Sequence, residues 1–69
     1  MEIYITDGRI YRVTGMGSLD AFDEYFSDII ARTNGFAHAR HFIEAHNGKA
    51  YQLDRNHTIK RQVPPPRTP

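Results

Sequence analysis

The stretch "EIYITDGRIYRV", residues 2–13, decides the fold of this chain. It contains two β-rich runs separated by Asp7-Gly8, a dipeptide that supplies the positive φ angles of a tight type I′ turn. The alternation places its isoleucines on one face of the resulting hairpin: Ile3, Ile5 and Ile10. The sequence therefore predicts an N-terminal β-hairpin with this isoleucine face toward the core.

The opposite face of the hairpin carries Tyr4 and Tyr11, which a two-residue loop places directly across from each other. An aromatic cross-strand pair on the solvent side stabilises a sheet by a fraction of a kcal/mol. The alternative is that both side chains contact another protein. Tyr4 and Tyr11 are therefore candidate partner-binding residues.

Residues 18–32, "SLDAFDEYFSDIIAR", follow after a glycine-containing loop and have the pattern of an amphipathic helix. Ser18 is a good N-cap, so the helix is expected to begin at Leu19. Asn34-Gly35 tolerates the left-handed backbone of a C-cap and should end the helix. The apolar positions share one stripe at helical spacing: Leu19, Phe22, Phe26, Ile29 and Ile30. This stripe should face the sheet.

Acidic residues occupy another side of this expected helix: Asp20, Asp23, Glu24 and Asp28. Like charges at i, i+4 spacing destabilise a helix by about a few tenths of a kcal/mol per pair. The helix dipole explains carboxylates in the first turn but not Asp28, and residues 13–31 contain no lysine or arginine. The stripe is either an ordinary solvated face or a ridge that docks on a basic protein surface. We treat its four members as candidate partner-binding residues.

Residues 36–47, "FAHARHFIEAHN", fit two structures. Alanine favours a helix, in which Arg40 and Glu44 would form an i, i+4 pair and Gly48 would be the stop. Asn47-Gly48 is also a strong hairpin turn, which would make the stretch a strand. The alanine content favours the helix, and the strand remains the alternative.

Residues 49–63 predict a second hairpin, with a three-residue loop at Arg55-Asn56-His57. In that register Leu53 opposes Ile59 and Tyr51 opposes Arg61. Most of its apolar side chains then collect on the core face: Tyr51, Leu53, Ile59 and Val63. The remaining residues 64–69, "PPPRTP", should form a mobile, extended, proline-rich tail.

Together these elements predict an α+β fold in one small domain, residues 1–63. A chain of 69 residues has a thin core, and without cysteine it has neither disulfides nor thiolate metal sites. Partner binding or assembly into a homodimer would supply further stability. No apolar run is long enough for a membrane helix or a secretory signal, so we expect a cytoplasmic protein without membrane contact.

The charge is divided unevenly along the chain. Residues 1–30 hold six acidic residues against two basic ones, a net charge of −4, and residues 31–69 have a net charge of +5. The two halves either neutralise each other in the fold or bind charged surfaces. The basic residues and one histidine of the second hairpin region are the alternative, nucleic-acid-binding candidates: Lys49, Arg55, His57, Lys60 and Arg61. A pI near 8.2 and a core position for Tyr51 argue against this alternative.

No motif indicates a reaction, a cofactor or a metal. His38, His41 and Glu44 would spread over about 120° of a helix, which suits a metal poorly. A histidine nuclease would need a helix after His57, where the sequence predicts a strand. We therefore expect a non-enzymatic chain without cofactor or metal.

The overall profile resembles the small accessory proteins of bacteriophages that bind and inhibit a host protein. The features that carry this resemblance are the size, the absence of cysteine, the tight hairpins and one acidic helix. The resemblance implies occlusion of a basic site on the target. The sequence thus predicts a protein-binding module, with nucleic-acid binding as the alternative.

Overall fold

The computed structural model describes residues 1–15 and 17–66. The predicted N-terminal hairpin is confirmed: β1 (Glu2–Thr6) and β2 (Arg9–Val13) are antiparallel, with Tyr4 opposite Tyr11. Asp7 and Gly8 have φ angles of 50° and 74°, as a tight primed turn requires. The isoleucine face is fully buried.

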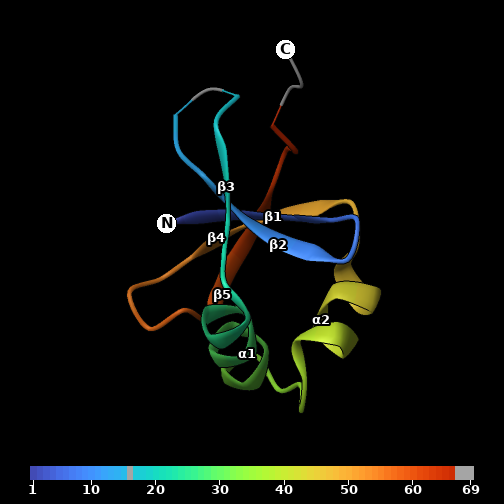
Figure 1. The fold of residues 1–69 in the computed structure, drawn as a ribbon. Coiled ribbons are helices and arrows are strands. Elements are labelled where there is room, and N and C mark those ends of the chain that lie inside the picture. Colours follow the sequence, from blue (N-terminus) through green and yellow to red (C-terminus); the bar gives the residue numbers. More distant parts are fainter. Residues whose placement is uncertain (16, 67–69) are drawn as a thin grey trace.

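Five antiparallel strands form one sheet in the order β3-β2-β1-β4-β5, where β3 is Leu19–Ala21, β4 is Lys49–Leu53 and β5 is Ile59–Val63. The two helices, α1 (Glu24–Thr33) and α2 (Ala39–His46), cover one face of this sheet (Figure 1). The prediction of an α+β fold is confirmed.

The predicted start of the first helix was wrong. Leu19 and its two successors form β3, and α1 begins at Glu24. Asp23 is the N-cap instead of Ser18, because its carboxylate accepts a hydrogen bond of 2.8 Å from the Phe26 N–H. The predicted end is confirmed, with Asn34 as the C-cap and Gly35 at φ 91°.

Residues 39–46 form the helix α2, so the helical alternative for this region is the right one. The helix is shorter than the predicted stretch, and the N–H of its first residue is capped from α1. Asp28 of α1 accepts a hydrogen bond of 3.1 Å from the Ala39 N–H. Phe36 lies in the connection before α2 and packs against Phe42, with ring centroids 5.3 Å apart.

The C-terminal hairpin is confirmed, with one correction of register. Leu53 opposes Ile59, as expected, but a bulge makes Tyr51 oppose Gln62 instead of Arg61. The shift turns Val63 toward Ala50, on the face away from Tyr51. Residues 64–66 have no regular secondary structure, and residues 67–69 of the predicted tail lie outside the described residues.

The core lies between the covered face of the sheet and the two helices. Its buried members come from both layers: Ile3, Ile5, Ile10, Ile30, Ala31, Phe42, Tyr51 and Leu53. Burial of Tyr51 was predicted from the alternation in β4 and is confirmed. Among residues 1–15 and 17–66, no helix lies over the other face of the sheet (Figure 1).

Candidate functional site

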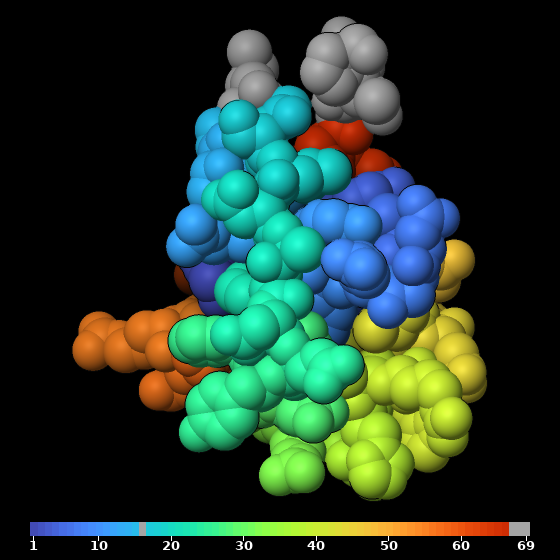
Figure 2. All heavy atoms as spheres, viewed as in Figure 1, coloured from blue at the N-terminus to red at the C-terminus, as the bar shows by residue number. Residues whose placement is uncertain are grey.

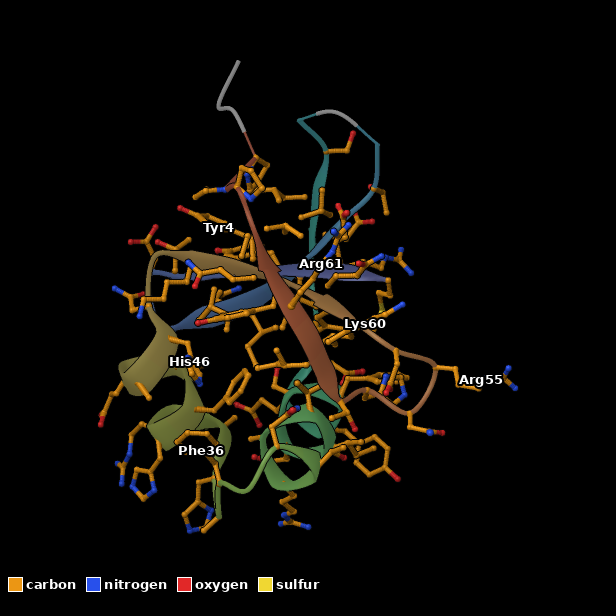
Figure 3. The ribbon with its side chains drawn as sticks, turned by 180° about the vertical axis from the view of Figure 1, so that it is seen from behind. Tyr4, Phe36, His46, Arg55, Lys60 and Arg61 are labelled. Carbon is orange, nitrogen blue, oxygen red and sulfur yellow. The ribbon has the colours of Figure 1, made fainter. Side chains whose placement is uncertain are left out.

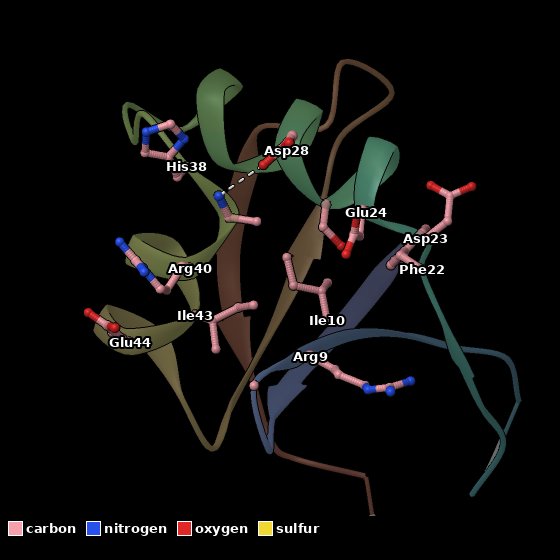
Figure 4. A pocket seen from close by; sticks show the side chains of 13 residues that line it. Arg9, Ile10, Phe22, Asp23, Glu24, Asp28, His38, Arg40, Ile43 and Glu44 are labelled. Atoms are coloured by element: carbon pink, nitrogen blue, oxygen red, sulfur yellow. Dashed lines mark hydrogen bonds between the residues drawn. The ribbon is translucent and has the colours of Figure 1, made fainter.

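A groove of about 930 Å³ lies between α1, α2 and the turn that joins β1 to β2 (Figure 4). We call it the α1–α2 groove. Its apolar surface comes from Ile10 of β2, Phe22 before α1 and Ile43 of α2. Ser27, which is 7% exposed, lies among them. A space of this size and lining can take part of a ligand or a side chain of another protein.

Two carboxylates of α1 face the α1–α2 groove. Glu24 and Asp28 are one helical turn apart and project into the space between the helices, where Ile10 and Ile43 also point (Figure 4). The nearby Arg9 and Arg40 side chains point away from it, as Glu44 does. The lining of the groove holds four carboxylates against Arg9 and Arg40, together with apolar side chains, and it would favour a cation with an aliphatic stem.

The four acidic candidate residues do not form the expected ridge along one helix. Asp20 lies on β3, where its Oδ2 accepts a hydrogen bond of 3.0 Å from Arg12 in an exposed ion pair. Asp23 caps α1 and Asp28 caps α2, so both carboxylates have structural roles. Only Glu24 and Asp28 remain together at i, i+4 spacing.

Tyr4 and Tyr11 lie on the face of the sheet that the helices leave uncovered (Figure 3). The strand registers align them in one row across all five strands: Ala21, Tyr11, Tyr4, Ala50 and Val63. Both tyrosines are half-buried by their neighbours in this row and the next. They stabilise the sheet as a cross-strand pair, and their exposed parts stay candidate contact surface.

The residues of the alternative, nucleic-acid-binding set are spread over three places. Lys49 begins β4, while Lys60 and Arg61 lie on the edge strand β5. Arg55 projects from the β4–β5 loop, well away from Tyr4 (Figure 3). His57 has a φ of 66° and its ring packs against Phe26 of α1, with centroids 6.3 Å apart. These side chains do not surround an aromatic residue.

His46 lies in an aromatic cluster with Phe36, Phe42 and Tyr51. Its Nδ1 is 2.9 Å from the hydroxyl of Tyr51, and its ring is 4.9 Å from that of Phe42. Burial lowers the pKa of His46 below its ordinary value of 6.5, and the positive charge of Lys49 lowers it further. Burial also raises the pKa of Tyr51. Both side chains are therefore neutral at neutral pH, and they share one hydrogen bond between the tyrosine hydroxyl and the imidazole Nδ1.

The lowered pKa of His46 predicts a loss of stability in acid. Below pH 6.5, and until the lower pKa of the folded state is passed, the unfolded chain binds more protons than the folded one. The melting temperature should therefore fall from neutral pH to about pH 5. His46→Gln should show a smaller fall in a thermal melt, whereas His41→Gln, at an exposed position, should behave like the unaltered protein. An unchanged pH dependence in His46→Gln would contradict this assignment.

The structure assembles no metal centre from the histidines. Within residues 1–15 and 17–66, no three His, Asp or Glu side chains are grouped so that they could hold a metal ion. His38 and His41 pack edge to face at the start of α2, with ring centroids 5.6 Å apart. In the same part of the chain, no helix has the length and apolar character needed to span a membrane.

Several groove residues were missed by sequence reasoning because they come from three separate elements. Ile10 was assigned to the core, and Ile43 belongs to the stretch 36–47, for which a helix and a strand were both considered. Only the pairing of α1 with α2, fixed by the hydrogen bond from Ala39 to Asp28, brings them beside Glu24. The i, i+4 spacing of Glu24 and Asp28 was the one signal in the sequence.

Comparison of the chain with protein-family models, curated proteins and solved structures finds no match. The proposals below therefore depend on the geometry and charge of the chain's own residues.

Proposed function

We propose that this chain is a small, non-enzymatic protein-binding module that holds a lysine or arginine side chain of a basic partner protein in the α1–α2 groove. One observation carries the proposal. Glu24 and Asp28 point into a partly apolar groove, and the side chains of Arg9 and Arg40, which also line it, extend outward (Figure 4). No ion pair within the described residues neutralises Glu24.

The groove suits both parts of a long basic side chain. The methylene stem would pack on Ile10 and Ile43, and the charged head would reach the carboxylate of Glu24. Asp28 would contribute through the carboxylate oxygen that does not accept from Ala39. Such binding would occlude a basic site on the partner, which is how an inhibitor of the bacteriophage type would act.

The test uses affinity capture from a lysate, repeated after nuclease treatment, with Glu24→Gln and Glu2→Gln as a matched pair. Glu2 is an exposed carboxylate on β1, away from the groove. A protein partner should survive nuclease treatment and bind Glu24→Gln about tenfold or more weakly, because a partly desolvated charge pair is lost. Glu2→Gln should bind as the unaltered protein does.

Titration with short blocked peptides then tests the groove directly. A peptide with one lysine between glycines should shift the backbone amide signals of Glu24, Asp28 and Ile43, and its norleucine analogue should bind more weakly. Equal binding of both peptides, or a partner that binds Glu24→Gln normally, would contradict the proposed function.

Nucleic-acid binding is kept as the alternative function because Tyr4 and Tyr11 are paired on the uncovered face, with Arg61 in the adjacent row. Aromatic rings beside a cation can stack on single-stranded bases. The half-buried rings and the dispersed basic residues favour only weak, salt-dependent binding. Tight binding of an oligonucleotide at physiological salt, lost in Arg61→Gln, would favour this alternative instead.

A further inference from the structure

The strand β3 is a free edge of the sheet. Thr14 donates its N–H to the Ser18 carbonyl and Phe22 donates to the Ile10 carbonyl, each at 2.9 Å. Backbone groups alternate in an antiparallel pair, so the N–H and C=O groups of Leu19 and Ala21 point outward, away from β2. In the space-filling view, no other segment of the described residues lies over β3 (Figure 2).

The two edge strands of the sheet differ in how well they are protected against pairing with another chain. The edge strand β5 carries Lys60 and Arg61, contains the irregular pairing opposite Gln52 and Leu53, and is followed by prolines. Charges, bulges and prolines are the features that prevent edge strands from pairing with other chains. The strand β3 has neither a bulge nor a proline, and its one charged residue, Asp20, is held by Arg12 in an exposed ion pair.

Exposed apolar side chains lie near this free edge, with Leu19 on the uncovered face of the sheet and Phe26 in the helix on the covered face. Four large hydrophobic residues are exposed in the part of the chain that the structure describes: Met1, Leu19, Tyr25 and Phe26. Leu19 belongs to β3 itself, and Tyr25 contacts Phe26 in α1. Met1 and Phe26 line a depression of about 340 Å³ that β3 borders through Asp20 and Ala21. Clustered exposed apolar residues mark binding surfaces.

We propose that β3 is the docking site for an extended, uncharged segment of a partner protein, which adds a strand to the sheet and places an apolar side chain in the depression. The outward backbone groups require an extended backbone as the occupant, and the apolar lining selects an apolar side chain. The depression and the α1–α2 groove are lined from opposite sides of Phe22. Docking at β3 is therefore a second binding site in addition to the proposed function.

Neither of the two other candidate occupants fits this edge. The chain's own residues 64–66 are prolines, which have no N–H to donate to a new ladder. A second copy that paired all three residues of β3 with their symmetry equivalents would place Asp20 directly opposite Asp20. Like charges directly opposed across a strand pair are destabilising.

The test adds a short blocked peptide, in which valine alternates with threonine, to the isotope-labelled protein. Hydrogen exchange of the Leu19 and Ala21 amides should slow by about tenfold or more on binding, because both amides become donors to the new strand. Ala21→Pro should abolish the binding, since it removes one outward N–H and leaves the ladder to β2 intact. The matched control Ala21→Val keeps that N–H and should bind the peptide. A thermal melt verifies that both variants fold.

Three outcomes would overturn the proposal. The first is that the peptide does not bind even at high concentration, and the second is that Ala21→Pro binds it as strongly as the unaltered protein does. The third is that the free protein sediments as a dimer that Ala21→Pro dissociates. Phe26→Ser gives a second readout. It should weaken binding of the peptide without unfolding the protein, because the Phe26 side chain is already 42% exposed. Glu24→Gln should leave this peptide bound normally, so failure of the groove and failure of the β3 site are distinguishable.

Discussion

Replacing Phe42 with alanine is expected to lower the free energy of unfolding by about 3–5 kcal/mol. Phe42 is fully buried, and its ring contacts Phe36 and His46 at centroid distances of 5.3 and 4.9 Å. A domain of this size has only about 3–10 kcal/mol of stability in total. The variant should therefore be largely unfolded or close to it, as measured by urea denaturation followed by circular dichroism.

The matched control is Tyr25→Ala, which removes an aromatic ring that is 73% exposed. A surface change of this kind should alter the free energy of unfolding by about 0.5 kcal/mol or less. If Phe42→Ala were no more destabilising than Tyr25→Ala, α2 would not pack on the sheet as described. The α1–α2 groove would then lose one of its walls.

The first hairpin could be predicted from the sequence because every determinant is local. Asp7-Gly8 fixes the turn, the turn fixes the register, and the register fixes which face is apolar. The end of α1 at Asn34-Gly35 and the hairpin that closes at His57 are local in the same sense. The first hairpin, the end of α1 and the existence of the second hairpin are confirmed, whereas the register of the second hairpin needed correction.

The start of α1 could not be predicted correctly because two N-cap residues compete in the sequence. Ser18 and Asp23 both precede helical patterns, and Leu19 fits the apolar stripe of a longer helix. The decision comes from β2, which pairs with residues 19–21 and extends the sheet by one strand. This pairing is a tertiary effect, so local propensity did not reveal it.

The pairing of β1 with β4 and the bulge in the second hairpin are also tertiary features. The bulge moved Val63 to the uncovered face and left Arg61 beside Gln52, whose Oε1 accepts a hydrogen bond of 2.8 Å. The candidate site was predictable only in part, for the same reason. Glu24 and Asp28 were identified from their spacing, whereas the groove needs three elements that are distant in sequence.

Asn34→Ala is expected to cost about 2–3 kcal/mol of stability, an unusually large effect for a helix C-cap. The Asn34 amide nitrogen donates to the Ile30 carbonyl at 2.7 Å and to the His57 carbonyl at 2.9 Å. Its Oδ1 accepts a hydrogen bond of 2.8 Å from the Ile59 N–H. One side chain thus joins the end of α1 to the β4–β5 loop. Alanine leaves the His57 carbonyl and the Ile59 N–H without this partner, whereas the Ile30 carbonyl still accepts from the backbone N–H of residue 34.

The variant Asn34→Asp distinguishes the contribution of the donor group of this side chain from that of its acceptor oxygen. The carboxylate is similar in size and can still accept from Ile59, but it cannot donate to the carbonyls of Ile30 and His57. Urea denaturation should therefore rank the unaltered protein above Asn34→Asp and Asn34→Ala, and hydrogen exchange of the Ile59 amide should accelerate mainly in Asn34→Ala. Because His57 holds a left-handed backbone conformation, loss of its carbonyl partner should also free its ring from Phe26. Equal stability of all three proteins would show that packing alone positions the β4–β5 loop against α1.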